Sequence, residues 1–576
     1  MEQRNLLLAI VLSVGILIAF QFLIAKFHPL APPAARAPAV TQTAPKRSGE
    51  AAPAKSVTVG VPAAPGAQTR EEVLASQPRV AIDTPSLHGS IDLVGARFDN
   101  LTLAKYRQTT APNSPDVVLL EPTGTKHPYF AQFGWVAEQG PVKVPGPDTR
   151  WTAPAGAKLT PATPVTLSWN NGQGLIFTRT VSVDENYMFT VRQAVRNTTD
   201  KPVELSSYGL INRTGTPHVL GYYILFEGMI GELHGSLQEV KYASLKTGQP
   251  DAYSSTGGWL GFTDKYWLTA LVPPQHAGVK ARFTHVTEAG VDRYQTDFTG
   301  PAVTVPAGGT AATATRFFAG AKELSLLQNY EAQGVPRFDL AIDFGWFYFL
   351  TKPIFLALEF FASILGNFGL AILLLTLLIK LAFFPLANKS YQAMAKMRLL
   401  QPEMQKIRER FPDDKARQQQ ETMALYKKVG ANPMAGCLPI VIQIPVFFSL
   451  YKVLFVTIEM RHAPFYGWIH DLSAPDPTSF ANLFGLLPFS PGAVPVIGHF
   501  LMIGGWPIIM GITMFLQQKL NPQPVDPMQA KMFMVLPIVF TYMLSAFPAG
   551  LVIYWAWNNT LSIAQQWAIM HRAGAA

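Results

Sequence analysis

The 576-residue sequence is poor in cysteine and in charged side chains. Its single cysteine, Cys437, excludes an intramolecular disulfide, so any exported domain must be held by its hydrophobic core. Charged residues make up 14% of the chain, against about 25% in a typical soluble protein. The deficit is concentrated in particular stretches, which indicates soluble and membrane parts in series. The net charge of +9 alone does not indicate nucleic acid, because the placement of the charges matters more than their sum.

Several catalytic motifs are also missing. The sequence has no Gly-x-x-x-x-Gly-Lys-Ser/Thr loop for a nucleotide, no His-Glu-x-x-His pair for a metal and no Gly-x-Ser-x-Gly elbow for a nucleophilic serine. We therefore expect no enzyme activity, no cofactor and no metal site. A small-molecule transporter remains as an alternative, although such proteins often repeat their groups of spans and we find no repeat.

The first apolar run covers residues 6–25, between Arg4 and Lys26. A spanning helix needs about 20 residues, whereas the core of a cleaved signal has about 7–15. We read residues 1–26 as an uncleaved signal anchor, with a cleaved signal as the alternative. Residues 27–78 are rich in Pro, Ala, Thr and Ser, which predicts a disordered tether.

Residues 79–320 show a different pattern. Short alternating or β-branched runs recur between Gly, Pro, Asn and Asp residues, for example in 165–169, 175–183, 187–192 and 279–285. Many short strands with frequent turn signals predict an all-β sandwich. Residues 322–331 then predict a short helix that leads to the membrane.

Beyond Asp343 the chain is mostly apolar. Within the connecting segment 321–366, the aromatic-rich residues 346–365 predict an amphipathic helix that lies in the membrane interface. Residues 367–576 predict five spans. We expect them at about 369–386, 438–458, 494–516, 532–547 and 549–570, which with the anchor makes six.

The distribution of basic residues predicts the orientation. Segment 388–436 carries ten Lys and Arg residues, whereas segment 459–495 carries only Arg461. Positive loops stay in the cytoplasm, so both termini are expected inside and the β-domain outside. The basic segment also has apolar residues at helical spacing, from Met394 to Ile407, and a turn at Pro412. It predicts a helical hairpin, either as a solvated face that enforces topology or as a docking surface for anionic lipids, ribosomal RNA or nascent chain.

Lys380 lies inside an otherwise apolar run and demands an explanation. It could extend to the interface, pair with an acid or line a wet cavity; the later spans contain no acid, which weakens the second reading. The third is favoured by polar residues that this span and the later spans carry at membrane depth. They are Thr376, Gln443, Gln517, Asn558, Asn559, Ser562, Gln565 and Gln566.

Several ordered segments resemble the YidC membrane protein insertases of Gram-negative bacteria. The segments are residues 343–346, 379–386, 394–398, 400–402, 436–445, 468–472 and 547–555. The resemblance covers essentially the whole chain. It implies a multi-span α-helical inner-membrane protein with a large periplasmic β-supersandwich, and a hydrophilic groove through which nascent membrane proteins are inserted and helped to fold.

The resemblance also implies roles for individual residues. Lys380 takes the place of the basic groove residue, usually Arg in the family, so the charge is kept but the bidentate guanidinium is lost. Thr376 would lie on the groove wall. We also assign Gln443 and Asn559 to the groove, because they are polar residues of the later spans. The hydrophobic slide would comprise Ile444, Pro445, Phe447, Tyr554 and Trp555. Lys389, Lys396, Arg398, Lys406, Arg408 and Arg410 would form the cytoplasmic docking surface. The expected partners are nascent inner-membrane proteins, the Sec translocon, the ribosome and anionic lipids, but not DNA.

Overall fold

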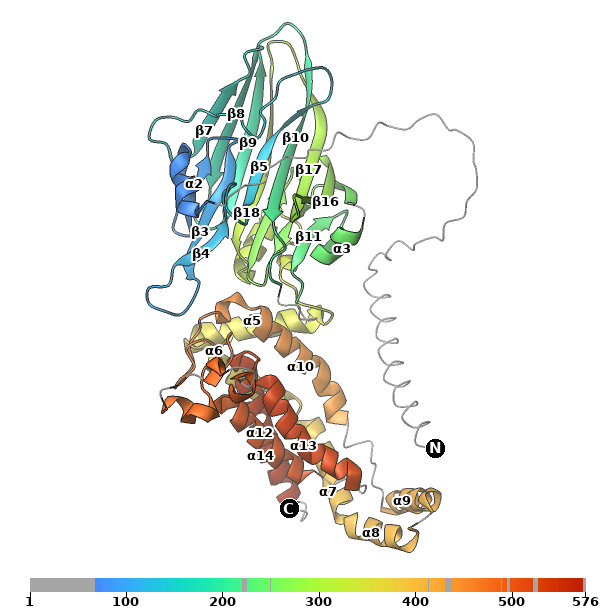
Figure 1. Cartoon of the computed structure of the whole chain (residues 1–576). Helices are drawn as coiled ribbons and strands as arrows, with labels where there is room; N and C mark the ends of the chain where they lie inside the picture. Colours follow the sequence, from blue (N-terminus) through green and yellow to red (C-terminus); the bar gives the residue numbers. More distant parts are fainter. Residues whose placement is uncertain are drawn as a thin grey trace, which may run out of the picture.

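A computed structural model describes residues 68–219, 225–248, 250–412, 414–429, 438–487, 489, 491–494, 498–521 and 527–572. The predicted anchor and most of the predicted tether lie outside the described residues. The described part divides into a region of β-strands and a region of helices, joined near residue 324 (Figure 1).

The β-region, hereafter the β-domain, contains two antiparallel sheets that face each other. The first sheet has, in spatial order, β13 (Asp251–Thr256), β16 (Gly278–Glu288), β17 (Val291–Val305), β10 (Val203–Thr214), β5 (Tyr129–Ala137), β3 (Arg97–Arg107), β2 (Leu87–Asp92), β1 (Arg79–Asp83) and β6 (Lys158–Leu159, parallel to β1), with β4 (Asp116–Leu120) paired to β3. The second has β12 (Ser236–Val240), β11 (Gly228–Leu233), β14 (Trp259–Thr263), β15 (Trp267–Val272), β18 (Thr310–Ala321), β9 (Met188–Asn197), β8 (Leu175–Val183) and β7 (Val165–Asn170). The prediction of an all-β domain is confirmed.

Aromatic side chains from both sheets fill the space between them. The Phe98 ring of the first sheet lies 5.2 Å from the Phe189 ring and 5.5 Å from the Phe317 ring of the second. In β8 every second residue is buried, as strand periodicity requires of a half-buried sheet. One of these buried positions is Arg179, whose guanidinium donates to the backbone carbonyls of Ala96 and Phe133 instead of to a carboxylate.

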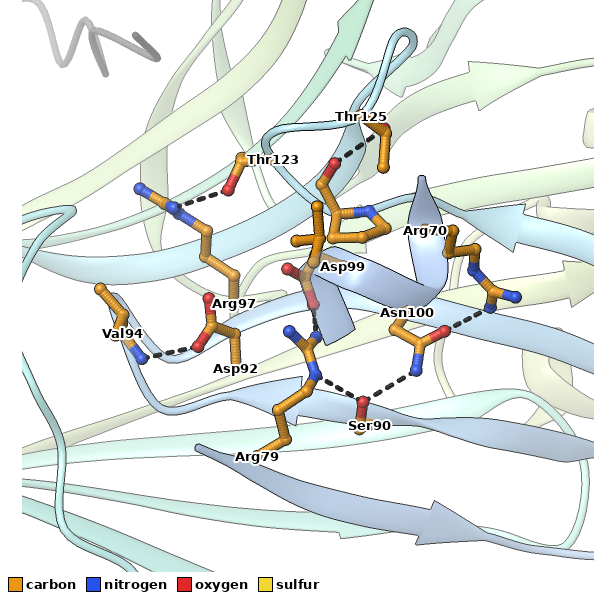
Figure 2. Close-up of polar contacts among 12 residues, drawn as sticks. Arg70, Arg79, Ser90, Asp92, Val94, Arg97, Asp99, Asn100, Thr123 and Thr125 are labelled. Atoms are coloured by element: carbon orange, nitrogen blue, oxygen red, sulfur yellow. Dashed lines mark hydrogen bonds and ion pairs between the residues drawn. The ribbon is translucent and has the colours of Figure 1, made fainter. Parts of the chain in front are cut away.

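A buried polar network holds the start of the described chain against the first sheet (Figure 2). The helix α2 (Arg70–Ser76) begins with a capping box formed by Thr69 and Glu72. Its Arg70 donates to Asn100. Arg79 donates to Ser90 at 2.7 Å and pairs with the buried Asp99. These contacts tie α2 and β1 to β2 and β3, so we assign the network a structural role.

The remaining helices follow the strands in the sequence, except α3 (Tyr242–Thr247). They are α4 (Leu324–Ala332), η1 (Phe338–Ala341), α5 (Tyr348–Leu365), α6 (Phe368–Ala382), α7 (Phe384–Leu399), α8 (Gln401–Arg410), α9 (Lys415–Val429), α10 (Leu438–Val456), η3 (Ile458–Met460), η4 (Phe480–Gly485), η5 (Pro491–Ala493), α11 (Gly498–Leu501), α12 (Gly505–Leu520), α13 (Pro527–Leu544) and α14 (Ala549–Arg572). The helix α5 lies crosswise between the β-domain and the other helices, while α8 and α9 project at the opposite end (Figure 1).

Two predicted helix boundaries are wrong. The span expected at 369–386 ends at Ala382, because the chain bends by 68° before Pro385 enters the first turn of α7. The span expected at 494–516 begins only at Gly505 and runs to Leu520. Gly/Pro-rich sequence before it forms short turns of helix instead.

The basic segment also forms three helices, α7, α8 and α9, where the sequence predicted a hairpin of two. The apolar face from Met394 to Ile407 belongs to two helices, since α7 ends at Leu399 and α8 begins next to Pro402. Leu400 and Met404 pack against Leu425 and Tyr426 of α9, so the hairpin proper is α8 with α9. Asp414 accepts the Arg417 N–H at 2.9 Å and so caps the start of α9.

By length and composition, one described helix could cross a membrane, namely α5. The bent pair α6–α7 qualifies as a second if taken as one span. The sequence instead assigned α5 to the interface and expected five spans after it. The length criterion therefore does not establish six spans, and that count stays a prediction.

Candidate functional site

Lys380 lies in the last turn of α6, two residues before the helix ends. The helix starts at a well-defined cap, where the Asn367 side chain accepts the Leu370 N–H at 3.1 Å. At the other end, the bend before α7 brings the first turns of α7 back beside Lys380. The bend therefore places side chains of α7 next to Lys380, whereas a straight continuation of α6 would carry them away from it.

A cavity of about 50 Å³, enough for a few water molecules, adjoins the Lys380 side chain. We call it the Lys380 cavity. Helices α6, α7, α10 and α14 all contribute to its wall. The lining residues are Thr376, Ile379, Lys380, Phe383, Leu386, Ala387, Tyr391, Gln443, Val446, Leu450, Tyr554, Asn558 and Gln565.

Polar side chains of α10 and α14 form one side of the Lys380 cavity. The Lys380 ammonium donates to the Ser562 hydroxyl at 2.8 Å, and this hydroxyl donates in turn to the Asn558 carbonyl at 2.8 Å. Gln443 donates to the Asn558 side chain at 3.1 Å. Within the described residues, no carboxylate lies within ion-pair distance of Lys380. The positive charge is thus held by a neutral partner beside a space that admits water.

The structure brings together three of the four residues predicted for the groove, namely Thr376, Lys380 and Gln443. The Thr376 hydroxyl is already bonded to the Ile372 carbonyl of its own helix at 2.6 Å, so it offers little to a ligand. Asn559 does not line the cavity. Its amide donates to Thr513 of α12 at 3.3 Å, because the neighbouring Asn558 occupies the face of α14 that points to Lys380.

The residues predicted for the hydrophobic slide form an aromatic contact between α10 and α14. The Phe447 ring lies 4.8 Å from the Trp555 ring and 6.5 Å from the Tyr554 ring. Ile444 is exposed, and Pro445 is half-buried on the same helix. Tyr554 is buried and lines the Lys380 cavity, so it faces inward rather than toward the outer surface.

The predicted cytoplasmic docking residues lie on α7 and α8. Four of them are exposed and two are half-buried along the helices. The exposed residues are Lys389, Lys396, Lys406 and Arg410, and the half-buried ones are Arg398 and Arg408. They form a basic surface at the end of the molecule farthest from the β-domain (Figure 1).

The sequence analysis missed two residues. Tyr391 lines the Lys380 cavity, but the predicted span ended at Leu386 and left this tyrosine in the loop. Lys452 of α10 is buried and pairs with Asp343 at 2.6 Å, which joins α10 to the segment after the β-domain. A second lysine inside an apolar run is the signal that the sequence offers, and its partner Asp343 lies outside the predicted spans.

Comparison with known proteins covers both regions. The family model of the YidC periplasmic domain matches residues 79–357, and that of the 60Kd inner membrane protein matches residues 360–575. The first match extends past the predicted domain end at 320 and includes α4 and part of α5.

Curated relatives match over nearly the full length. The membrane protein insertase YidC of Bradyrhizobium diazoefficiens is 51% identical over 600 aligned positions, which cover 100% of this chain and 97% of the relative. That of Nitrobacter hamburgensis is 56% identical over 517 positions, covering 88% of this chain and 85% of the relative. A crystal structure of an active YidC insertase with its first transmembrane domain resolved is 17% identical, with a TM-score of 0.35, over 86% of this chain and 95% of that one. The relatives are insertases rather than enzymes or small-molecule transporters, and this chain belongs to the YidC family of inner-membrane protein insertases.

Proposed function

We propose that the Lys380 cavity receives the hydrophilic segment of a nascent inner-membrane protein on its way across the membrane. The observation that carries the proposal is that the positive charge of Lys380 has a neutral partner and lies beside a cavity. The Lys380 ammonium adjoins space for water and donates a hydrogen bond to the neutral Ser562. An unneutralised cation in a region of low dielectric constant attracts acidic groups more strongly than it would in water.

The proposed mechanism needs no nucleotide. Water and a positive charge part-way into the bilayer shorten the apolar path that a polar tail must cross. Lys380 holds acidic groups of that tail as a point charge, and Ser562 and Gln443 provide hydrogen bonds. The apolar segment of the client then moves into lipid along Phe447 and Trp555, driven by burial worth roughly 25 cal/mol per Å². The membrane potential adds about 2.3 kcal/mol per outward-moving negative charge at about 100 mV.

The proposed topology has six spans, with both termini in the cytoplasm and the β-domain in the periplasm. The basic α7–α9 segment supports it, because positive segments remain on the cytoplasmic side. The same surface is proposed to dock the ribosome, nascent chain and anionic lipids. Cooperation with the Sec translocon is proposed from the family alone.

The test replaces Lys380 by Glu and by Arg in the full chain. Insertion of a single-span client with a short acidic tail is followed in vesicles by protease protection. We expect Lys380→Arg to retain insertion and Lys380→Glu to lower its rate by at least about tenfold, the effect of losing about 1.4 kcal/mol of attraction. The matched control is Lys519→Glu, the same charge reversal at an exposed lysine of α12 outside the cavity. Full activity of Lys380→Glu would exclude the electrostatic role.

A further inference from the structure

A second, larger cleft lies where the β-domain meets the helical region. One wall is the end of β3 with the loop that leads to β4, and the other is the loop that follows η3. Its volume is about 610 Å³. Five basic side chains line it and none of its lining residues is acidic, so we call it the basic cleft. The five are Lys105, Arg107, Arg461, His462 and His470.

The two walls of the basic cleft are fixed to each other. The Arg461 guanidinium donates to the Arg107 carbonyl at 2.7 Å and to the Gln108 carbonyl at 3.2 Å. It also lies 5.4 Å from the centre of the Trp267 ring of β15. Arg461 therefore builds the cleft. Lys105, Arg107 and His470 are exposed on its walls, and one guanidinium nitrogen of Arg107 donates to the Pro112 carbonyl of the same loop.

Aromatic residues indicate the depth of the basic cleft relative to the membrane. Tyr466 and Trp468, on the same loop as Arg461 and His470, are 63% and 41% exposed. Exposed Trp and Tyr side chains of membrane proteins gather at the level of the lipid headgroups. The β-domain beside this loop belongs to the part that matches the periplasmic family model. The cleft thus lies at the height of the headgroups of the periplasmic leaflet.

We propose that the basic cleft binds the phosphodiester headgroup of an anionic phospholipid of the periplasmic leaflet. Its charge fits an anion, because Lys105, Arg107 and Arg461 converge there, while the neighbouring carboxylate of Asp471 lies 3.9 Å from the ring of His462 and is not among the lining residues. Its depth favours a lipid over an acidic peptide or free phosphate, since lipid phosphates are concentrated at this level. Headgroup binding fixes the β-domain against the membrane surface on the side of the β3–β4 loop, a role distinct from that of the Lys380 cavity.

The experiment places a photoreactive benzophenone side chain at Thr110, an exposed residue of the cleft. The full chain is reconstituted in vesicles of phosphatidylcholine and phosphatidylglycerol at about four to one, irradiated, and analysed for lipid adducts by mass spectrometry. We expect phosphatidylglycerol adducts to exceed their share of the vesicle lipid severalfold. Neutralising one cation near a membrane surface should lower that enrichment by about fivefold.

The test variants are Lys105→Gln and Arg107→Gln, singly and together. The matched control is Lys126→Gln with Lys280→Gln, which removes the same charge from exposed lysines of the β-domain outside the cleft. Enrichment that falls only in the cleft variants supports the proposal. Adducts in the bulk lipid ratio, or an equal fall in the control, would overturn it. Displacement of the lipid by millimolar inorganic phosphate or by a hexaglutamate peptide would also overturn it, in favour of a free anion or an acidic chain respectively.

Discussion

The β-domain and the helical region treat buried positive charge differently. In the β-domain, Arg282 pairs with Asp297 at 2.8 Å, and Arg179 is held by two backbone carbonyls. Lys322 is buried, donates to Thr263 at 2.9 Å and lies in the field of the carboxylates of Asp264, Asp343 and Glu227. Lys380 of the helical region donates to the neutral hydroxyl of Ser562 beside a cavity. In the first region the charges belong to the fold, whereas in the second a charge is left available to a client.

Removing a carboxylate from the β-domain should have the largest effect on stability. Asp297 is buried and accepts from Arg282 and Gln295, so Asp297→Ala leaves a guanidinium without its partner. Loss of one member of such a pair costs about 3–5 kcal/mol. Hydrogen exchange of the β10 and β17 amides in the full chain measures it. Asp200→Ala, at an exposed site, should change the same amides by less than about 0.5 kcal/mol; equal effects would remove the distinction between the regions.

The next effect concerns Lys452, the buried lysine of α10 that does have a carboxylate. Lys452→Met should destabilise the junction by about 2 kcal/mol, because Asp343 loses its cation but keeps the N–H groups of Phe226 and Gly345. Hydrogen exchange of β11 and of the segment around Asp343 measures the loss. If Lys452→Met left the exchange of these amides unchanged, the ion pair with Asp343 would not stabilise the junction, and Lys452 and Lys380 would not differ in their role in the fold.

A third prediction concerns pH at the junction. Burial, with the carboxylates Glu359 and Glu323 nearby, raises the pKa of Glu459 in η3 to about 8. A raised folded-state pKa stabilises the fold fully below the ordinary value of 4.5, and this contribution is lost as the pH rises through about 8. The free energy of unfolding should therefore fall by at most about 1.4 kcal/mol per pH unit across that window.

Thermal unfolding of the detergent-solubilised chain at several pH values checks this dependence. The variant Glu459→Gln should flatten it, whereas Glu185→Gln, at an exposed site, should not. A slope that is unchanged in Glu459→Gln would assign the pH dependence to other groups.

The sequence predicted strands better than it predicted the ends of the helices. Strand β8 matches its predicted bounds, because alternation and turn residues are local signals. The bend after Ala382 was missed because Phe383 and Phe384 continue the apolar run, and Pro385 alone does not fix where a helix stops. Asn558 and Asn559 are adjacent amides, and only the packing of α14 against both α10 and α12 places Asn558 beside Gln443 and Asn559 beside Thr513.

The smallest effect on stability should come from Lys380 itself. In Lys380→Met no carboxylate among the residues that the structure describes loses its cation, and Ser562 keeps its bond to the Asn558 carbonyl. We expect hydrogen exchange of α6 and α14 to change by less than about 1 kcal/mol, because the substitution removes a buried charge without leaving another unpaired. Insertion of an acidic-tailed client should nevertheless fall, while a client with an uncharged tail should be spared. A loss of stability as large as that of Lys452→Met would instead make Lys380 part of the fold, since a charge that the structure needs for its own packing is not free for a client.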